Sequence, residues 1–229
     1  MRAVYLKDIA IKENDPLNIK GNKFHHLKNV VRVNREDDIL VLDGKGLGRI
    51  YKISELNKNN MKLDPSDVFK ESTHTKDIDL VIGKLKRDAM DLAVKQACEL
   101  GVKNIFICHT DFSQTYSLNL DRLERIIDSA IEQSNNLIRP DIGELENIKS
   151  LDFDQYQQVF LFSLEGDQGR KGFQGRAVVM IGPEGGFSIE EEEFLLKINN
   201  IQAIKLDMPI LRAATAVPCA LGYVHGIYQ

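Results

Sequence analysis

The chain has 229 residues, and its 43% hydrophobic and 28% charged residues are typical of a globular protein. A formal net charge of −4 excludes a global positive field that would draw the whole molecule onto nucleic acid or anionic lipid. No apolar run approaches the roughly 20 residues of a membrane-spanning helix, and the first residues lack a signal-peptide core, so we expect a soluble, cytoplasmic protein without membrane contact. The cysteines Cys98, Cys108 and Cys219 lack C-x-x-C spacing, so we expect neither a disulfide framework nor a metal site.

The N-terminal third is basic, and its sequence pattern predicts β structure. Residues 1–72 carry a net charge of +3, whereas residues 73–229 carry −7. Residues 20–35 hold five Lys and Arg side chains, two His and no acid, which indicates either a solvated face or a surface for a polyanion. The apolar run 39–42, the glycine-rich stretch 43–48 and the alternating segment 49–53 predict a hairpin, with a second turn at 57–60. Residues 70–76 are the best candidate for a linker.

From residue 77 onward, short apolar runs alternate with helical patterns. This alternation predicts an α/β domain with a mostly parallel sheet covered on both faces. Gly101 is expected to end the first helix, and Ser188 with Glu191 predicts a capping box at the start of a later one. The predicted strands are 78–83, 104–108, 159–162, 177–181 and 203–206, and the predicted helices are 86–100, 120–134, one opening at 188, and 213–228.

Two strand-to-helix loops are candidates for a ligand site, because ligands of parallel sheets bind at the carboxyl ends of the strands. The first is Gly182-Pro183-Glu184-Gly185-Gly186-Phe187, whose glycines expose backbone groups; it lacks the Gly-Lys-Ser/Thr of a phosphate-binding P-loop, and its acids favour a cationic or neutral ligand. The second, residues 206–212, ends in one cation, Arg212. By itself, the first loop is explained equally well as a tight turn, and an isolated arginine such as Arg212 more commonly pairs with a nearby acid than acts in catalysis.

Taken in chain order, the motifs resemble the ribosomal small-subunit RNA methyltransferase E family of the SPOUT methyltransferases. The motifs that carry this resemblance are His26 with Val30-Val31-Arg32, Lys86-Arg87-Asp88-Ala89-Met90-Asp91, Gln96 to Val102, Glu132-Gln133-Ser134, Ile181 to Ser188, and Ile210-Leu211-Arg212. The resemblance implies a small PUA-like β-barrel domain over residues 1–72 that helps to bind RNA. It implies a SPOUT α/β domain with a C-terminal trefoil knot over residues 73–229. It further implies a homodimer that uses S-adenosylmethionine to methylate N3 of a uridine in 16S rRNA of the small ribosomal subunit.

The same resemblance assigns roles to individual residues. Arg212 or Lys86 would stabilise the uracil anion that forms when N3 loses its proton. The residues expected to bind S-adenosylmethionine are Ser163, Leu164, Glu165, Gly182, Pro183, Glu184, Gly185, Gly186, Leu206, Asp207, Ile210, Leu211 and Arg212. The residues expected to contact RNA through phosphates are Lys23, His26, Lys28, Arg32 and Arg35.

The sequence departs from the family pattern at positions that would face cofactor or RNA. The family's Thr-Glu-Thr-Ala after Leu-Arg is Ala213-Ala214-Thr215-Ala216 here, its Glu-Arg after the second strand of the domain is Asp111-Phe112, and its Gly-Arg after Glu-Gln-Ser is Asn135-Asn136. Two alternatives to uridine-N3 methylation therefore stay open. One is methylation of another RNA nucleotide by the same fold, and the other is a protein that binds cofactor or RNA with little catalysis.

Overall fold

The computed structural model describes residues 2–9, 11, 14–72, 76–167 and 172–229. Within it the chain forms two compact units: Met1–Thr73 with Asp128–Arg139, and His74–Ile127 with Pro140–Gln229. The segment around residue 130 therefore groups with the N-terminal unit although it is distant in sequence. The predicted domain boundary between residues 72 and 73 adjoins residues 73–75, which lie outside the described residues.

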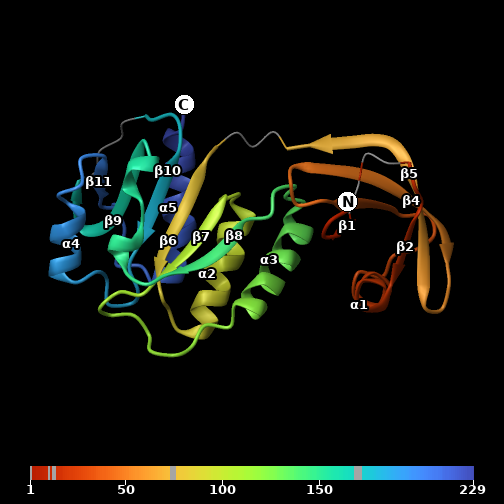
Figure 1. The fold of residues 1–229 in the computed structure, drawn as a ribbon, viewed down its shortest axis with the longest axis horizontal. Helices are drawn as coiled ribbons and strands as arrows, with labels where there is room; N and C mark the ends of the chain where they lie inside the picture. Colours follow the sequence, from red (N-terminus) through yellow and green to blue (C-terminus); the bar gives the residue numbers. More distant parts are fainter. Residues whose placement is uncertain (1, 10, 12–13, 73–75, 168–171) are drawn as a thin grey trace. The chain divides into compact units, whose positions relative to one another are not determined.

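The N-terminal unit is built on a five-stranded curled sheet (Figure 1). Its strand order is β1-β3-β4-β5-β2; β1 pairs with β3 in parallel, and the other pairs are antiparallel. Two short helical segments, α1 and the π-helical η1, connect β2 to β3. The elements are β1 (Arg2–Tyr5), β2 (Leu17–Lys20), α1 (Gly21–His25), η1 (His26–Val30), β3 (Asp38–Leu42), β4 (Leu47–Leu56) and β5 (Asn60–Glu71).

Two apolar clusters hold this unit together. Phe24 of α1 and Leu27 of η1 are fully buried in the first cluster, where Met61 of β5 joins them. In the second cluster, Tyr5 of β1 packs with Ile131 of helix α3 (Leu120–Ser134). Burying a large apolar side chain contributes roughly 1.5–3 kcal/mol. The last turns of α3 are thus part of the N-terminal core.

The second unit contains a six-stranded sheet in which all strands run parallel (Figure 1). Its order is β11-β9-β10-β6-β7-β8, so the central strands β10 and β6 are buried along their whole length. The strands are β6 (Ile78–Gly83), β7 (Asn104–Cys108), β8 (Asp141–Leu145), β9 (Gln158–Asp167), β10 (Ala177–Ile181) and β11 (Ile201–Ile204). The remaining elements are α2 (Arg87–Glu99), η2 (Ile148–Ser150), η3 (Phe153–Gln155), α4 (Ile189–Leu195) and α5 (Ala213–Ile227).

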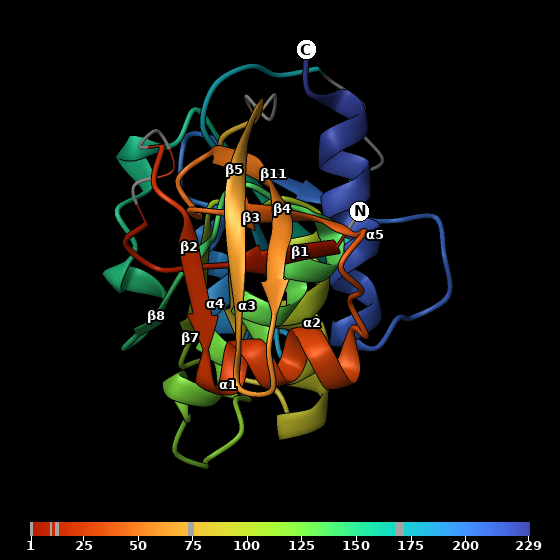
Figure 2. The ribbon, with the colours of Figure 1, turned by 90° about the vertical axis from the view of Figure 1, so that its right-hand side faces the viewer.

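Alternate residues of each strand point to opposite faces of this sheet, and each face has its own cover. On one face, Val81 of β6 and Met180 of β10 pack with Leu195 of α4. On the other face, the ring of Phe162 of β9 lies 6.0 Å from the ring of Tyr223 of α5. Helices α2 and α5 pack against each other, as Figure 2 shows. The sheet is therefore a middle layer, which leaves the ends of its strands as places for a site.

The predicted architecture, a small N-terminal β domain followed by a mostly parallel α/β domain, is confirmed, whereas the C-terminal knot stays a prediction. The strands predicted at 78–83, 104–108 and 177–181 and the helix at 120–134 have the predicted bounds, and Gly101 has a φ of +74° after α2. Three details were wrong: β5 runs through Glu71 into the expected linker, β9 continues to Asp167 instead of ending at 162, and the last strand covers Ile201–Ile204 rather than 203–206.

Candidate functional site

The glycine-rich loop leaves the sheet at the carboxyl end of β10 and leads into α4. The N–H of Gly186 donates to the carbonyl of Pro183 at 2.9 Å, which closes a tight turn, and Gly186 has a φ of +76°. A Cβ placed on Gly182 would lie only 2.7 Å from the carbonyl carbon of Gly186. This contact is with backbone, so the loop cannot keep its shape with a side chain at position 182.

The start of α4 fixes this loop to its neighbour. Ser188 and Glu191 form the predicted capping box: the N–H of Glu191 donates to Ser188 Oγ at 3.3 Å, and Glu191 Oε2 accepts from the N–H of Ser188 at 2.9 Å. Glu191 Oε1 also accepts from the N–H of Asp111, in the loop after β7, at 3.1 Å. The hydroxyl of Ser188 in turn donates to the carboxylate of Asp111. The loops after β7 and β10 are therefore held together.

A cavity of about 400 Å³ lies at the carboxyl ends of β9, β10 and β11. Its volume is in the usual range for small-molecule sites. Three strands, the two loops that follow β10 and β11, and two helices supply its walls. The lining residues are Phe162, Ser163, Leu164, Glu165, Ile181, Gly182, Pro183, Glu184, Gly185, Gly186, Phe187, Glu192, Ile204, Lys205, Leu206, Met208, Pro209, Ile210, Leu211, Ala213 and Ala216.

Carboxylates give part of the cavity wall a negative character. Glu192 Oε1 accepts a hydrogen bond from the Ser163 hydroxyl at 2.9 Å, and that hydroxyl also accepts from the N–H of Glu165 at 3.2 Å. Glu184 Oε1 accepts from the backbone N–H of Lys86, at the start of α2, at 3.1 Å. A ligand with a positive charge is attracted by these groups.

Another part of the wall is apolar and open to solvent. Leu164, Met208 and Ile210 line the cavity, yet these residues are 56%, 55% and 81% exposed. Large apolar side chains gathered at the mouth of a cavity mark a place where a ligand or partner binds. The site thus combines a carboxylate-lined side with an apolar side suited to a flat, weakly polar group.

The structure gathers most of the predicted cofactor-binding residues around this one cavity. All of them line it except Asp207 and Arg212, which are exposed on the same loop. Met208 and Pro209, which lie within the predicted segment 206–212, line the cavity as well. The sequence reasoning missed Phe162, Ile181, Phe187, Glu192, Ile204, Lys205, Ala213 and Ala216. Several of these lie within or beside the predicted segments and could have been found by extending them. Glu192 lies on α4, and no sequence signal distinguished it from its three acidic neighbours.

The two predicted catalytic residues lie at the starts of helices beside the cavity. Arg212 is the N-cap residue of α5, is exposed, and lies between Leu211 and Ala213, which both line the cavity. Lys86 is the N-cap residue of α2, is also exposed, and is joined through its N–H to Glu184. Both side chains therefore start next to the mouth of the cavity, and their catalytic role stays a prediction.

The predicted RNA-binding residues lie together on the N-terminal unit, around α1 and η1. Lys23 Nζ lies 2.6 Å from Glu132 Oε1, and Lys28 Nζ donates to the carbonyl of Asn57 at 3.0 Å, so these two cations already serve the fold. The remaining predicted residues, His26, Arg32 and Arg35, are exposed. Exposed cations are the ones that can exchange solvent for phosphate oxygens.

A buried thiol near the glycine-rich loop can be excluded as a nucleophile. Burial, together with the negative charge of Glu191, raises the pKa of the Cys108 thiol to about 12. Cys108 is therefore protonated at neutral pH, and it packs as an apolar side chain.

Among the residues that the structure describes, no group of three or more His, Cys, Asp and Glu side chains is placed to hold a metal ion. No helix in the described part of the chain is long and apolar enough to span a membrane.

Two family models match the chain. One, described as "RNA methyltransferase domain", matches residues 72–225, and another, described as "RNA methyltransferase PUA domain", matches residues 19–66. Ribosomal RNA small subunit methyltransferase E 2 of Borreliella burgdorferi is 29% identical over 98% of this chain and 98% of its own length. Ribosomal RNA small subunit methyltransferase E of Rickettsia conorii is 26% identical over 94% of this chain and 91% of its own length.

The fold is also similar to solved structures. A ribosomal RNA small subunit methyltransferase E from Neisseria gonorrhoeae, bound to S-adenosylmethionine, has a TM-score of 0.85 and 25% identity, with 100% of this chain and 98% of that chain covered. A methyltransferase from Legionella pneumophila, in complex with S-adenosylmethionine, has a TM-score of 0.83 at 18% identity, with 99% and 97% covered. At that lower identity the second likeness concerns the fold alone.

Proposed function

We propose that this chain, which belongs to the ribosomal small-subunit RNA methyltransferase E family of RNA methyltransferases, transfers a methyl group from S-adenosylmethionine to N3 of a uridine in 16S rRNA. The observation that carries the proposal is the cavity at the carboxyl ends of β9, β10 and β11, since residues from both family motif loops line it together. The relative from Neisseria gonorrhoeae, which matches the whole of this chain, binds S-adenosylmethionine.

The residues of the cavity fit this cofactor. Exposed apolar side chains such as Ile210 and Leu164 offer a surface for an adenine ring, and the carboxylates of Glu184 and Glu192 tolerate a sulfonium cation. When bound, S-adenosylmethionine supplies an electrophilic methyl group. The task of the glycine-rich loop is then to hold the acceptor, the methyl carbon and the sulfur in line, because orientation contributes most to such a transfer.

The acceptor atom N3 of a uridine is weakly acidic, so the uracil anion needs stabilisation as the proton leaves. Arg212 starts at the mouth of the cavity, at the N-terminus of α5, where the helix dipole adds to its positive charge. Lys86 approaches the same mouth from α2. We expect Arg212→Ala to lower kcat about 100-fold while leaving cofactor affinity within about 2-fold, as is typical when one stabilising donor is lost. Unchanged turnover would remove Arg212 from the mechanism.

The decisive experiment is nucleoside mass spectrometry of 16S rRNA. Small subunits that lack N3-uridine methylation are incubated with the protein and methyl-labelled S-adenosylmethionine. Labelled 3-methyluridine supports the proposal. A different labelled nucleoside would indicate another target for the same fold, and no labelled nucleoside, with cofactor binding confirmed in parallel, would indicate a binding protein with little catalysis. The last outcome would point to Ala213 and Ala214, which are buried beside the site and lack the hydroxyl and carboxylate of the family pattern.

We also propose that the N-terminal unit contacts the RNA through phosphates, with Arg32 and Arg35 as the main contributors. Each cation that neutralises a phosphate makes the affinity more dependent on salt, with a slope of about −0.7 to −0.9 in log K against log salt. The double variant Arg32→Gln with Arg35→Gln should therefore flatten the salt dependence by about 1.5 units. A slope equal to that of the wild type would contradict this assignment.

Family membership further supports a homodimer, a C-terminal trefoil knot and a place in the cytoplasm, where ribosomal subunits are modified. The oligomeric state is tested by sedimentation at micromolar protein concentration. A dimer is expected, and a monomer that is active under the same conditions would contradict this part of the proposal.

A further inference from the structure

We propose that Phe112 is a stacking platform for a base of the RNA substrate, at the mouth of the cofactor cavity. This inference rests on the proposed function and adds to it a residue that recognises the nucleic acid. Phe112 is 52% exposed, although the residues on either side of it, Asp111 and Ser113, are hydrogen-bonded to the rest of the fold. An exposed aromatic ring on a fixed loop is what sequence-tolerant recognition of single-stranded RNA uses.

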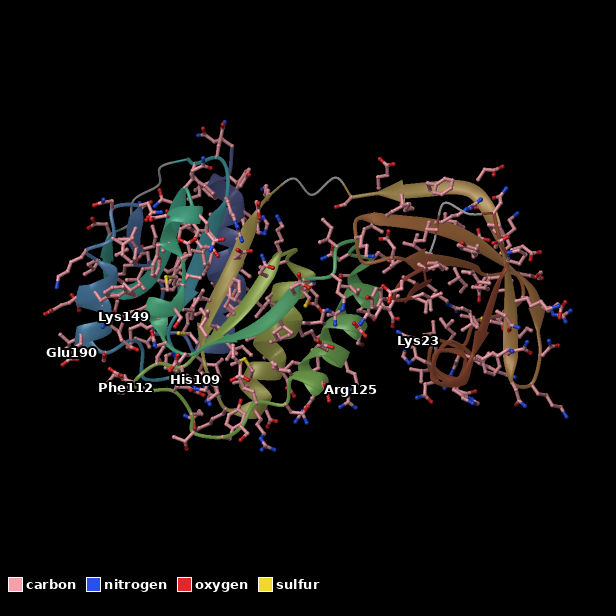
Figure 3. The ribbon with its side chains drawn as sticks, in the orientation of Figure 1. Lys23, His109, Phe112, Arg125, Lys149 and Glu190 are labelled. Carbon is pink, nitrogen blue, oxygen red and sulfur yellow. The ribbon has the colours of Figure 1, made fainter. Side chains whose placement is uncertain are left out.

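The position of the ring relative to the cavity is given by Gly185. A Cβ placed on Gly185 would lie 3.0 Å from Cβ and 3.2 Å from Cγ of Phe112, so the Phe112 side chain lies directly on the backbone of Gly185. Gly185 itself lines the cavity, whereas Phe112 does not. The ring therefore borders the cavity mouth from outside. Figure 3 shows Phe112 and His109 at the end of the sheet where β7 finishes, with Glu190 of α4 nearby.

The residues on both sides of Phe112 hold the loop in place. Asp111 is fixed to α4 by its N–H bond to Glu191 and by the hydroxyl of Ser188. Ser113 Oγ accepts from the N–H of Thr110 at 3.0 Å and from the N–H of Lys84 at 3.2 Å. Because the loop is fixed before any ligand arrives, stacking of a base on the ring requires little loss of conformational entropy in the protein.

Two basic residues begin the helix whose N-terminus is bonded to the same glycine-rich loop. The backbone N–H of Lys86 contacts Glu184, which is the direct neighbour of Gly185 in the loop. Lys86 and Arg87 are exposed at the start of α2. Phe112 and the backbone of Lys86 thus contact adjacent residues of one loop, Gly185 and Glu184. The exposed side chains of Lys86 and Arg87 are available for the phosphates that flank a stacked base.

Steady-state kinetics of a series of Phe112 variants distinguish stacking of an RNA base on the ring from mere packing of the ring against Gly185. The RNA substrate is the unmethylated small subunit, and the variants are Phe112→Ala, Phe112→Leu, Phe112→Tyr and Phe112→Trp. We expect KM for the subunit to rise about 10-fold in the Ala and Leu variants and to stay within about 2-fold in the Tyr and Trp variants. Affinity for S-adenosylmethionine, measured by calorimetry, should stay within about 2-fold in all four variants. A Leu variant with the KM of the wild type would overturn the inference, because leucine packs but cannot stack.

Fluorescence gives a second, direct readout because the chain contains no tryptophan. Phe112→Trp places the single indole of the protein at the proposed platform, and a matched control, Leu196→Trp, places one at an exposed position after α4. A 16S rRNA transcript should quench the indole at position 112 at saturation and leave the control nearly unchanged. Equal quenching in both variants, or none in either while RNA is bound, would overturn the inference.

The two proposals fail in different ways. If the wild type methylates no RNA, the proposed function is wrong, while quenching of the Phe112→Trp variant by bound RNA would still support stacking. If the wild type methylates RNA and the Leu variant matches it, only the role of Phe112 is wrong.

Discussion

The two ends of the six-stranded sheet use polar groups in opposite ways. At the amino end, Asp79 of β6 is fully buried and accepts three hydrogen bonds: from Asn104 Nδ2 at 2.7 Å, from the Tyr156 hydroxyl at 2.8 Å and from an Arg176 nitrogen at 2.8 Å. These partners precede or begin three other strands. The guanidinium of Arg176 also lies 4.9 Å from the centre of the Tyr156 ring.

At the carboxyl end, the strands finish in loops whose polar and apolar groups face a cavity. The glycines of the loop after β10 keep its backbone uncovered, and Ile210 and Leu164 remain exposed. The carboxylate of Glu192 faces a serine hydroxyl rather than a cation. This arrangement leaves groups available for a ligand, whereas the carboxylate of Asp79 at the amino end is occupied by protein donors.

The difference separates stability from function within a single sheet. The stability of the fold depends on a buried carboxylate that accepts hydrogen bonds from protein partners, because its removal leaves those buried partners without an acceptor. Loops whose groups are turned outward contribute little to folding and can be adapted to a ligand. Substitutions at the amino end should therefore change the free energy of unfolding, and substitutions at the carboxyl end should change binding.

The largest expected effect is at the amino end. Asp79→Ala leaves the Tyr156 hydroxyl and Asn104 without their buried acceptor and removes the ionic partner of Arg176. We expect the free energy of unfolding to fall by about 3 kcal/mol, at the low end for a buried ion pair because the Arg176 side chain is 30% exposed. Urea denaturation measures it. Asp141→Ala, an exposed carboxylate at the start of β8, is the control, with a change within about 0.5 kcal/mol. Equal losses in both variants would contradict the comparison.

A smaller effect, of the opposite kind, is expected at the carboxyl end. Gly182→Ala forces the glycine-rich loop apart, because the new methyl group would meet the backbone of Gly186 and Phe187. The free loop relieves this contact by moving its backbone, and a return to the binding shape then costs about 1–3 kcal/mol, so we expect affinity for S-adenosylmethionine to fall about 10- to 100-fold. Calorimetry measures it. Gly143→Ala in the edge strand β8 meets no atom within 4 Å and should bind as the wild type does. If both variants bind alike, the loop does not hold the cofactor.

The strands of the second unit were predicted from the sequence more accurately than the strands of the first unit, and the reason is physical. Strands β6 and β10 are buried on both faces, so an unbroken apolar run marks them. Strand β8 lies at the edge and is largely uncovered, and its short Asp141–Leu145 segment carries no such run. The short strands β1 and β2 and the helical turn around Phe24 likewise lack a periodic pattern long enough to recognise.

The candidate site was predictable where glycine and proline mark the loops, and not where tertiary contacts bring other residues to it. The loop at 182–187 has a local signal, and so does the segment that ends at Arg212. Glu192 and Phe112 reach the site only because α4 and the loop after β7 pack beside the glycine-rich loop. The network around Asp79 had no signal at all, because its four residues are spread over about 100 positions.

Two exposed isoleucines allow ligand binding at the carboxyl end to be tested without any change in the hydrophobic core. Ile210 and Ile189 are 81% and 78% exposed, but only Ile210 lines the cavity. Neither Ile→Ala change should alter the free energy of unfolding by more than about 0.5 kcal/mol. Ile210→Ala should raise KM for S-adenosylmethionine about 5-fold, which corresponds to about 1 kcal/mol of apolar contact with the ligand, and Ile189→Ala should not. Equal KM values for the two variants would remove Ile210 from the site.

The smallest expected effect is a dependence on alkaline pH that belongs to the amino end. Burial, and then the charge of Asp79, raises the pKa of Tyr156 above its usual 10.0. A hydroxyl that stays neutral in the folded protein but ionises in the unfolded chain stabilises the fold fully below pH 10, and this contribution is lost as the pH rises further. From about pH 8 to about pH 10.5, this one group should lower the free energy of unfolding by about 0.8 kcal/mol.

Tyr156→Phe removes that contribution, so its stability should fall less steeply than that of the wild type above pH 10, although it starts lower because Asp79 loses a donor. Burial also raises the pKa values of Tyr5, Tyr51, Tyr116 and Cys108, but these groups are common to both proteins and cancel in the difference. Urea denaturation at several alkaline pH values measures the two slopes. Parallel slopes would mean that the Tyr156 hydroxyl ionises as easily in the folded protein as in the unfolded chain, and that the amino end is more open to water than its hydrogen bonds indicate.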